Sequence, residues 1–205
     1  MKIALICFHK NLGRYPNEWI KIYKNSILGQ TYNNFDIFEL NYGNGEERIF
    51  DGSFFESIDL KDHAEAHNHL LKKCFSLGYD LIFNTNVDDK YPLDRLQIQM
   101  DNIDSDFAIM SGNYTSFSDT TPQIATTNFQ KLEISNEFKN SHNIIAHPAC
   151  LYSRKIMEYN DSLRSEEIPA DDFSLWKRLL DKGAKFKILP NVLMYYRISE
   201  LKTFL

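Results

Sequence analysis

Two pairs of adjacent aspartates are the residues of this sequence best suited to chemistry. Asp88 and Asp89 directly follow an apolar run, and Asp171 and Asp172 precede a segment with aromatic and aliphatic side chains at helical spacing. Carboxylate oxygens are preferred ligands of Mg²⁺ and similar divalent cations, and a carboxylate can act as a general base. The sequence therefore offers a candidate metal ligand, Asp88, with Asp89 beside it, and a candidate base in the second pair.

Both acidic pairs also have a purely structural interpretation. Aspartate is a favoured residue for capping helix N-termini, so the first pair can cap a helix that begins near Pro92, and one member of the second pair can cap the helix that follows it. Glu166 and Glu167 lie close to the second pair, and a solvated acidic loop is a further alternative. Spacing alone does not show whether the two pairs meet in space.

Several histidines and arginines are weaker candidates. His63 and His67 fall on one expected helix without the spacing of a zinc-protease helix, which favours surface or capping roles. His147, which precedes Pro148 and the second acidic pair, is a candidate site residue. The sequence has no glycine-rich phosphate loop, so a bound phosphate needs a metal and cations. The candidate cations are Arg95, Arg154 and Arg197.

Alternating strand and helix patterns position these residues. Asp88 follows an expected strand, and open α/β sheets bind ligands at the carboxyl edge of their strands. The alternation predicts an α/β fold with a mainly parallel central sheet flanked by helices. Residues 111–142 are polar and predict irregular strands and loops around a binding site. In chain order we expect strands over residues 3–8, 35–40, 79–83, 107–110 and 146–152 and one or two over 185–196, with helices over residues 16–28, 62–77 and 172–182 and one beginning at Pro92 with Leu93, Leu96 and Met100 inward.

Bulk composition excludes several classes of protein. The 205 residues, 43% of them hydrophobic, suit one domain with a sizeable core. The net charge of -5 and the lack of a basic run argue against nucleic acid as a partner. No apolar run is long enough to span a membrane, and Cys7, Cys74 and Cys150 lack the spacing of a disulfide framework or zinc site. We expect a soluble, cytoplasmic protein with buried, reduced cysteines.

Ordered motifs along nearly the whole chain resemble the family 2 glycosyltransferases. Residues 26–37 read Ser-Ile-Leu-Gly-Gln-Thr-Tyr-Asn-Asn-Phe-Asp-Ile, which is similar to the family's Ser-Leu-Leu-x-Gln-Thr-Tyr-x-Asn-Phe-Glu-Ile. The other matching segments are Asn41 to Asn44 (family Asp-Asp-Gly-Ser), Ala66 to Asn68 (Ala-Arg-Asn), Asn86 to Asp89 (Asp-x-Asp-Asp) with Arg95-Leu96, His147-Pro148, Ala170 to Trp176 (Ala-Glu-Asp-Tyr-Asp-Leu-Trp), Leu189 to Leu193 (Leu-Pro-x-Val-Leu) and Tyr196-Arg197.

The resemblance implies a single-domain, Rossmann-like GT-A fold and an inverting, metal-dependent enzyme of the hexosyltransferase type. It implies that such an enzyme transfers a sugar from a nucleotide-diphosphate sugar to a hydroxyl of a glycan or small-molecule acceptor during glycan synthesis. Residues 1–110 are the implied nucleotide-sugar half, and residues 111–205 the implied acceptor and catalytic half. The implied roles are Asp172, with Asp171, in catalysis; Asp88 as ligand of Mn²⁺ or Mg²⁺; Phe8, His9, Asn41, His67, Asn68, Asn86 and Val87 at the nucleotide; and Asp89, Arg95, His147 and Arg197 at the acceptor or diphosphate.

Two other functions remain as alternatives. Asn41 and Asn86 stand where the family has acids, which is compatible with a non-catalytic module that binds nucleotide-sugars or glycans. A sugar-nucleotide pyrophosphorylase uses a related α/β fold and a metal, but residues 9–14 (His-Lys-Asn-Leu-Gly-Arg) are a poor match to the glycine-rich basic loop expected there.

Overall fold

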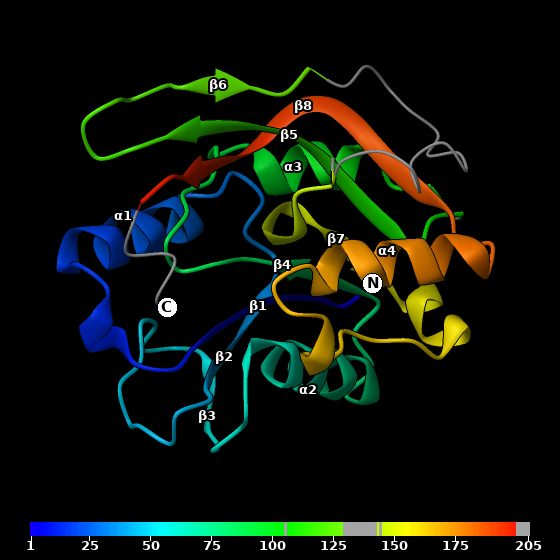
Figure 1. The fold of residues 1–205 in the computed structure, drawn as a ribbon, viewed down its shortest axis with the longest axis horizontal. Coiled ribbons are helices and arrows are strands. Elements are labelled where there is room, and N and C mark those ends of the chain that lie inside the picture. Colours follow the sequence, from blue (N-terminus) through cyan, green and yellow to red (C-terminus); the bar gives the residue numbers. More distant parts are fainter. Residues whose placement is uncertain (105, 129–142, 144, 200–205) are drawn as a thin grey trace.

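An eight-stranded, mainly parallel sheet with helices on both faces forms the centre of the molecule (Figure 1). The computed structural model describes residues 1–104, 106–128, 143 and 145–199. The strand order is β3-β2-β1-β4-β7-β5-β6, with β8 paired to β5. The strands are β1 (Ile3–His9), β2 (Asp36–Asn41), β3 (Phe54–Ser57), β4 (Leu81–Asn84), β5 (Ile109–Phe117), β6 (Ala125–Thr126), β7 (Leu151–Ser153) and β8 (Phe186–Arg197). The α-helices are α1 (Asn17–Leu28), α2 (His63–Ser76), α3 (Arg95–Asp101) and α4 (Asp171–Asp181), and the 3-10 helices are η1 (Leu12–Arg14), η3 (His147–Ala149), η4 (Arg154–Tyr159) and η5 (Ser165–Glu167).

The first half of the chain builds the parallel part of the sheet. β1 pairs in parallel with β2 on one side and with β4 on the other. His9 lies opposite Asn41, and Ile6 lies opposite Asn84. The carboxyl ends of the three strands therefore meet at one edge of the sheet. Because β1 is covered on both faces, its side chains alternate between two apolar environments, which explains its continuous apolar sequence.

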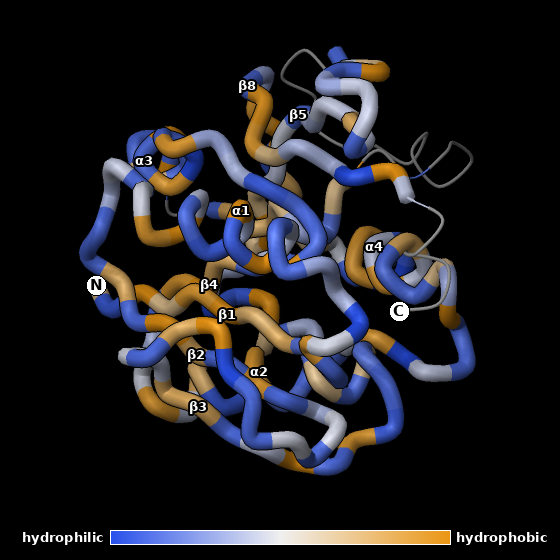
Figure 2. Tube along the Cα trace, turned by 90° about the vertical axis from the view of Figure 1, so that its left-hand side faces the viewer, coloured by the Kyte–Doolittle hydropathy of each residue, from blue (hydrophilic) through white to orange (hydrophobic). Residues whose placement is uncertain are grey.

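Two separate cores lie on the two faces of this sheet. Ala4 and Ile6 of β1 pack in a core that also holds buried residues of α2 and α4, whereas Leu5 and Cys7 pack in a core with residues of α1 and α3. Figure 2 shows that the central strands consist largely of hydrophobic residues and have helices on both sides. All three cysteines are buried and unpaired, as expected.

Local signals at the helix ends explain where α1 and α2 begin and end. Pro16 precedes α1 and Gly29 follows it, in agreement with the expected helix. Asp62 caps α2 by accepting hydrogen bonds from the backbone N–H groups of Ala64 (3.0 Å) and Glu65 (3.1 Å). Gly78, with φ of 85°, turns the chain into β4 after α2, which is a left-handed conformation that glycine adopts without steric cost.

The second half of the chain extends the sheet through the long strands β5 and β8. These pair in parallel, with a register irregularity around Gly112 and Asn113. A Cβ atom on Gly112 would lie 2.8 Å from the carbonyl oxygen of Asn191, so glycine permits this close approach. Pro190 lies within β8 at the irregularity and contributes no N–H to the ladder.

Several predicted elements differ from the structure. The region from residue 111, where irregular strands and loops were expected, begins with seven residues of the strand β5. Residues 129–142 lie outside the described part. The helix expected at Pro92 begins at Arg95, and Leu93, expected inward, is 54% exposed. Residues 146–152 contain η3 and only the start of β7. β3 was not expected at all. The fold class and the parallel arrangement of β1, β2 and β4 are confirmed.

Candidate active site

The first acidic pair lies in the turn after β4, at the carboxyl edge of the parallel strands. Asp89 is fully buried and accepts a hydrogen bond from the backbone N–H of Arg197 (2.9 Å). The carbonyl of Asp88 accepts a second hydrogen bond from Nε of Arg197 (2.9 Å), while the Asp88 residue is half-buried. The residue before α3 is Asp94, without a side-chain capping bond. The alternative in which the first pair caps this helix is therefore wrong.

Arg197 fixes this turn against the end of β8. Its guanidinium lies 4.3 Å from the ring centre of Trp19 and 4.6 Å from that of Phe117. It also pairs with the carboxylate of Asp119, which accepts a hydrogen bond from Nε1 of Trp19 (3.1 Å). Nη2 of Arg197 is buried without a hydrogen-bond partner among the described residues. Arg197 is thus chiefly a buried link between β8, α1 and the acidic turn.

The predicted nucleotide residues at the ends of β1 and β2, His9 and Asn41, make contacts with residues of the strands and loops around them. Nε2 of His9 lies 3.1 Å from Oε1 of Glu39, and both side chains are buried. Oδ1 of Asn41 accepts the backbone N–H of Gly43 (2.9 Å), and its Nδ2 donates to Glu47 (3.2 Å). His9 and Asn41 therefore lie at the predicted edge of the sheet, where their side chains stabilise the adjoining loops.

An aromatic group lies beside these two loops. The ring of Phe8, which is half-buried, meets Tyr42 edge-on at 6.3 Å between ring centres and His67 at 6.1 Å. The Nζ of Lys10 lies 5.8 Å from the ring centre of Tyr42. Such flat apolar surfaces at the carboxyl edge are suited to contact with a nucleobase.

Three other predicted site residues are hydrogen-bonded or buried within the protein. Asn68 exchanges two hydrogen bonds with the backbone of Leu163 (2.8 and 3.2 Å). Val87 is buried in the core. Arg95 is fully buried; its Nη2 donates to the carbonyl of Asn84 (2.9 Å) and its guanidinium lies 4.5 Å from the ring centre of Tyr91. The structure places Arg95 in the core, where it supports β4 from α3.

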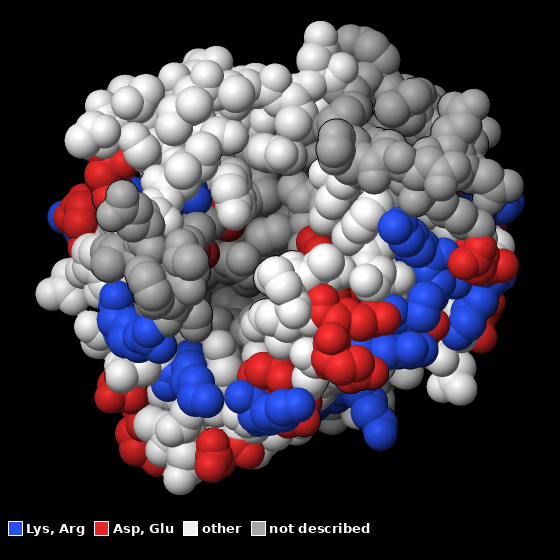
Figure 3. All heavy atoms as spheres, in the orientation of Figure 1, with Lys and Arg blue, Asp and Glu red and all other residues white. Residues whose placement is uncertain are grey.

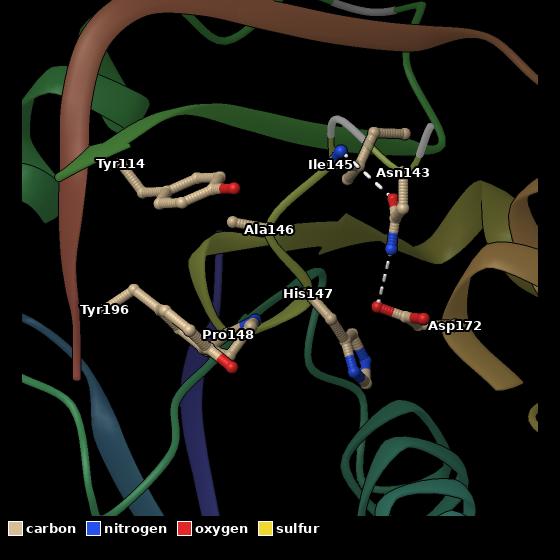
Figure 4. A pocket seen from close by; sticks show the side chains of 8 residues that line it. All are labelled: Tyr114, Asn143, Ile145, Ala146, His147, Pro148, Asp172 and Tyr196. Atoms are coloured by element: carbon tan, nitrogen blue, oxygen red, sulfur yellow. Dashed lines mark hydrogen bonds between the residues drawn. The ribbon is translucent and has the colours of Figure 1, made fainter. Parts of the chain in front are cut away.

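Asp172 of the second acidic pair lines a pocket of about 250 Å³. In Figure 4, Asp172 and His147 lie on one side of this pocket and the rings of Tyr114 and Tyr196 lie on the other. The two tyrosine rings meet edge-on, with 6.0 Å between their centres. The remaining lining residues are Asn143, Ile145, Ala146 and Pro148. A carboxylate opposite two aromatic faces is an arrangement suited to a sugar hydroxyl.

The carboxylate of Asp172 is held by two hydrogen bonds. Nδ2 of Asn143 donates to its Oδ2 (3.0 Å), and the backbone N–H of Phe173 donates to its Oδ1 (2.6 Å). Asn143 is itself oriented, because its Oδ1 accepts the backbone N–H of Ile145 (3.2 Å). Asp172 is half-buried and lines the pocket, so it remains within reach of a bound molecule.

Asp171, by contrast, turns toward α2. Its Oδ2 lies 3.1 Å from Nε2 of His63, and its side chain is only 7% exposed. This contact raises the pKa of His63, against the opposing effect of partial burial. Burial favours the protonated form of Asp171, yet the hydrogen bond from His63 holds the pKa of this carboxyl below its usual value. The residue before α4, Ala170, makes no side-chain cap. This contact across two helices was not expected from the sequence.

His147, which is half-buried and lines the pocket, contacts the buried His67. Their Nε2 atoms lie 3.3 Å apart, so one nitrogen must donate and the other accept. Burial, together with the neighbouring His147, lowers the pKa of His67 well below its usual value. Burial also lowers the pKa of His147, although Asp172 and Asp171 oppose this effect. Both rings are therefore neutral near pH 7.

Strand β8 connects the two acidic regions. Tyr196 lines the pocket of Asp172, and the next residue, Arg197, binds the turn that carries Asp88. Figure 3 shows a hollow near the centre of one face of the molecule, with acidic atoms visible inside it. Sequence reasoning missed Tyr114, Asn143 and His63 as parts of the site, since no local pattern marks contacts made across the fold.

The acidic turn after β4 fits a divalent cation that shares its ligands with a diphosphate. Among the described residues, no group of three or more His, Cys, Asp or Glu side chains could hold a metal ion by itself. Mg²⁺ is usually held through one or two carboxylates plus substrate phosphates and water. Asp88 supplies a half-buried carboxylate and Asn86, also half-buried, an amide oxygen. The residues present therefore fit such a cation.

Solved structures share this fold. No protein-family model and no curated protein matches the sequence. TarS 1–349 of S. aureus in complex with UDP matches with a TM-score of 0.69 and 15% identity over 97% of this chain and 61% of that chain. Mannosyltransferase PcManGT from Pyrobaculum calidifontis in complex with GDP-Man and Mn²⁺ matches with a TM-score of 0.64 and 12% identity over 97% of this chain and 57% of that chain.

The similarity is one of fold. This chain spans about 60% of the length of the TarS 1–349 structures that it matches. It has the Rossmann-like GT-A fold expected from the sequence, with a central, mainly parallel sheet and helices on both sides. Within the described residues, every helix is too short or too polar to cross a membrane.

Proposed function

We propose that this chain is an inverting glycosyltransferase of the family 2 type, which transfers a sugar, of the hexose type, from a nucleotide-diphosphate sugar to a hydroxyl of a glycan or small-molecule acceptor. The observation that carries the proposal is the position of Asp172, whose oriented carboxylate lines a pocket with aromatic walls. The shared fold with proteins solved with UDP and with GDP-Man supports a nucleotide-sugar donor.

Asp172 is the proposed catalytic base. A sugar hydroxyl is a weak nucleophile at neutral pH and needs a base within hydrogen-bond reach. The carboxylate takes the hydroxyl proton while the hydroxyl oxygen forms a bond to the anomeric carbon of the donor. The bond from that carbon to the diphosphate oxygen breaks in the same displacement, and its electron pair leaves with the nucleoside diphosphate. The attack occurs on the face opposite the leaving group, which inverts the configuration.

His147 and Asp171 support the base from two sides. His147 lines the same pocket and is neutral because burial lowers its pKa, so it adds no positive charge that would hold a proton away from Asp172. Asp171 is engaged with His63 on α2. We assign proton transfer to Asp172 and a supporting role to the other two residues.

The turn after β4 is the proposed position of the diphosphate. Asp88, with Asn86 beside it, is the proposed ligand of Mn²⁺ or Mg²⁺, whereas Asp89 is engaged with the backbone of Arg197. A divalent cation bound there supplies neutralisation of the negative charge on the leaving diphosphate. Because Arg95 is buried, we assign neutralisation of the diphosphate to the cation held by Asp88 and not to this arginine.

The nucleotide itself is placed by the first half of the chain, residues 1–110. Phe8 and Tyr42 offer aromatic surfaces at the carboxyl edge, and His67 lies between this group and the pocket. Asn41 and His9 shape the loops around the base. Residues 111–205 form the acceptor and catalytic half, because they contribute every lining residue of the pocket of Asp172.

A thermal-shift and turnover experiment tests the function. The folded protein is heated with UDP, GDP, dTDP or CMP, each with and without Mn²⁺, since a ligand that binds only the folded state raises the unfolding temperature. We expect one nucleoside diphosphate to give a metal-dependent shift that Asp88→Ala removes. The matching nucleotide-sugars are then tested for release of that nucleotide with an acceptor library. Absence of any shift and of any release would rule out the proposed function.

A second candidate function is a non-catalytic module that binds nucleotide-sugars. Asn41, which stands at a position of an acid in the resembled motif, is already bonded to Gly43 and Glu47, and this observation favours a weakened nucleotide site. The same experiment separates the two functions. Tight nucleotide binding without transfer to any acceptor would favour the binding module.

A further inference from the structure

His63 contacts one carboxylate of the second acidic pair and leaves the other to the pocket. Its Nε2 lies 3.1 Å from Oδ2 of Asp171, while Asp172 accepts from the neutral amide of Asn143. The two adjacent carboxylates at the start of α4 therefore have different partners: one has a group that can carry a positive charge, and the other does not.

We propose that His63 is a positioning residue that neutralises Asp171 and so sets the lower end of the pH range in which Asp172 can accept a proton. This inference rests on the proposed role of Asp172 as the base. Two carboxylates that share a site disfavour each other's ionised form. A positive charge on His63 cancels one of the two negative charges and so removes this mutual penalty.

The position of the pair makes this compensation necessary. The Asp171 side chain is only 7% exposed, so solvent does little to screen its charge, whereas the His63 side chain is 42% exposed and can exchange protons with water. No side-chain cap holds the start of α4. The contact between His63 and Asp171 therefore helps to hold this helix end, and with it the adjacent Asp172.

The other charged groups near His63 are consistent with this role. Asp62 at the start of α2 and Asp172 both favour its charged form. His67 and His147 also face His63, and burial lowers the pKa of both rings, so that neither competes as a cation near pH 7. On η5, which packs against α4, Glu167 is paired with Arg178. His63 is therefore the titratable group in direct contact with Asp171.

The chain provides a matched control. His69 lies on the same helix, and its Nε2 is 2.8 Å from Oε2 of Glu56, with a side-chain exposure of 34%. This second histidine–carboxylate pair is not part of the pocket. A substitution of His69 removes a comparable histidine–carboxylate contact from α2, but away from the proposed base.

The test is the pH profile of kcat/KM for transfer, measured for the full chain. We expect His63→Gln to move the acid limb upward by roughly one pH unit, the spread that local surroundings impose on aspartates in proteins. His63→Lys, which keeps a positive charge, should return the acid limb to its wild-type position, and His69→Gln should leave that position unchanged. In an Asp171→Asn background, His63→Gln should cause a smaller shift, because only the direct interaction between His63 and Asp172 then remains.

A second readout is independent of activity. The pKa of His63, measured by NMR of its imidazole, should fall in Asp171→Asn, because the hydrogen bond that raises it is lost. An unchanged pKa in that variant, an acid limb unmoved by His63→Gln, or an equal shift in His69→Gln would overturn the inference. If the wild-type chain turns over no donor, the proposed function fails, whereas an active wild-type chain with an unmoved limb refutes only the role of His63.

Discussion

The two acidic pairs use the same arrangement with different partners. In each pair one aspartate is buried and bound inside the protein, Asp89 by the backbone N–H of Arg197 and Asp171 by the ring of His63. The other aspartate, Asp88 or Asp172, is half-buried. One member of each pair is thus fixed inside the protein, while its neighbour remains partly exposed.

The difference between the partners has a chemical consequence. A backbone N–H does not titrate, so the anchor of the first pair does not change its donor with pH. An imidazole titrates near neutral pH, so the anchor of the second pair does. A metal ligand needs a constant negative charge, whereas a base must exchange a proton during each turnover. The pH-sensitive anchor lies beside the proposed base.

The largest expected effect is on catalysis and separates the two members of the second pair. Asp172→Asn should lower kcat by about 10²–10⁴-fold, the usual contribution of a general base, because the amide cannot accept the hydroxyl proton. Asp171→Asn, which keeps the shape of its side chain, should cost much less. Nucleotide release kinetics measure both, with unfolding temperatures as the control for folding. Equal losses in the two variants would contradict the assignment.

The next effect is on stability and separates the members of the first pair. Asp89→Ala leaves the buried backbone N–H of Arg197 without its acceptor, at a cost of about 2 kcal/mol, or roughly 4–8 °C in unfolding temperature for a chain of this length. Asp88→Ala should lower the unfolding temperature less, while removing the metal-dependent nucleotide shift. Thermal unfolding without nucleotide compares the two variants. A greater loss of stability in Asp88→Ala would reverse the roles.

The sequence identified the elements that rest on local signals. Continuous apolar runs located β1 and β4, and helix-end residues such as Pro16, Gly29 and Gly78 located α1 and α2. Because ligand sites in open α/β sheets lie at the carboxyl edge, Asp88 could be placed there. β3 was missed because four residues, Phe54–Ser57, carry little pattern of their own and pair only with β2.

The site was harder to predict because its contacts join distant segments. His63 and Asp171 are 108 positions apart, and no local periodicity encodes such a pair. Tyr114 in the pocket wall belongs to the long strand β5, whereas only irregular strands and loops were expected in that region. Arg95 was assigned to the ligand because Arg95-Leu96 resembles a family motif, yet the carbonyl of Asn84 and the ring of Tyr91 stabilise its guanidinium inside the core.

A smaller effect on catalysis tests the neutral partner of the base. Asn143→Ala removes the amide that donates to Oδ2 of Asp172. A hydrogen bond of this kind contributes about 1 kcal/mol, which corresponds to a roughly fivefold lower kcat. The KM for the donor should not change, since the amide lies in the acceptor pocket. Asn102→Ala, whose side chain bonds only within its own helix region, serves as the control. A change in donor KM alone would argue against this role.

The smallest expected effect is the pH dependence of the two anchors. The pKa of His63 is raised in the folded state, so its stabilisation is fully present below the unfolded-state value of about 6.5 and is lost as pH rises through the higher folded value. The pKa of Asp171 is lowered, so its part is present above an unfolded value of about 3.9 and is lost as pH falls through the lower folded value. The pair therefore stabilises the fold most between these two limits.

The difference between the two anchors can be measured from the unfolding temperatures of two variants at several pH values. His63→Gln should cost about 1–3 °C near pH 5.5, a small effect because solvent screens a partly exposed pair, and the cost should vanish at alkaline pH. The cost of Asp89→Ala should stay constant from pH 5.5 to 8.5, since its partner is a backbone N–H. Parallel curves for the two variants would mean that both anchors act through packing alone, and the distinction between a constant and a titrating anchor would then be lost.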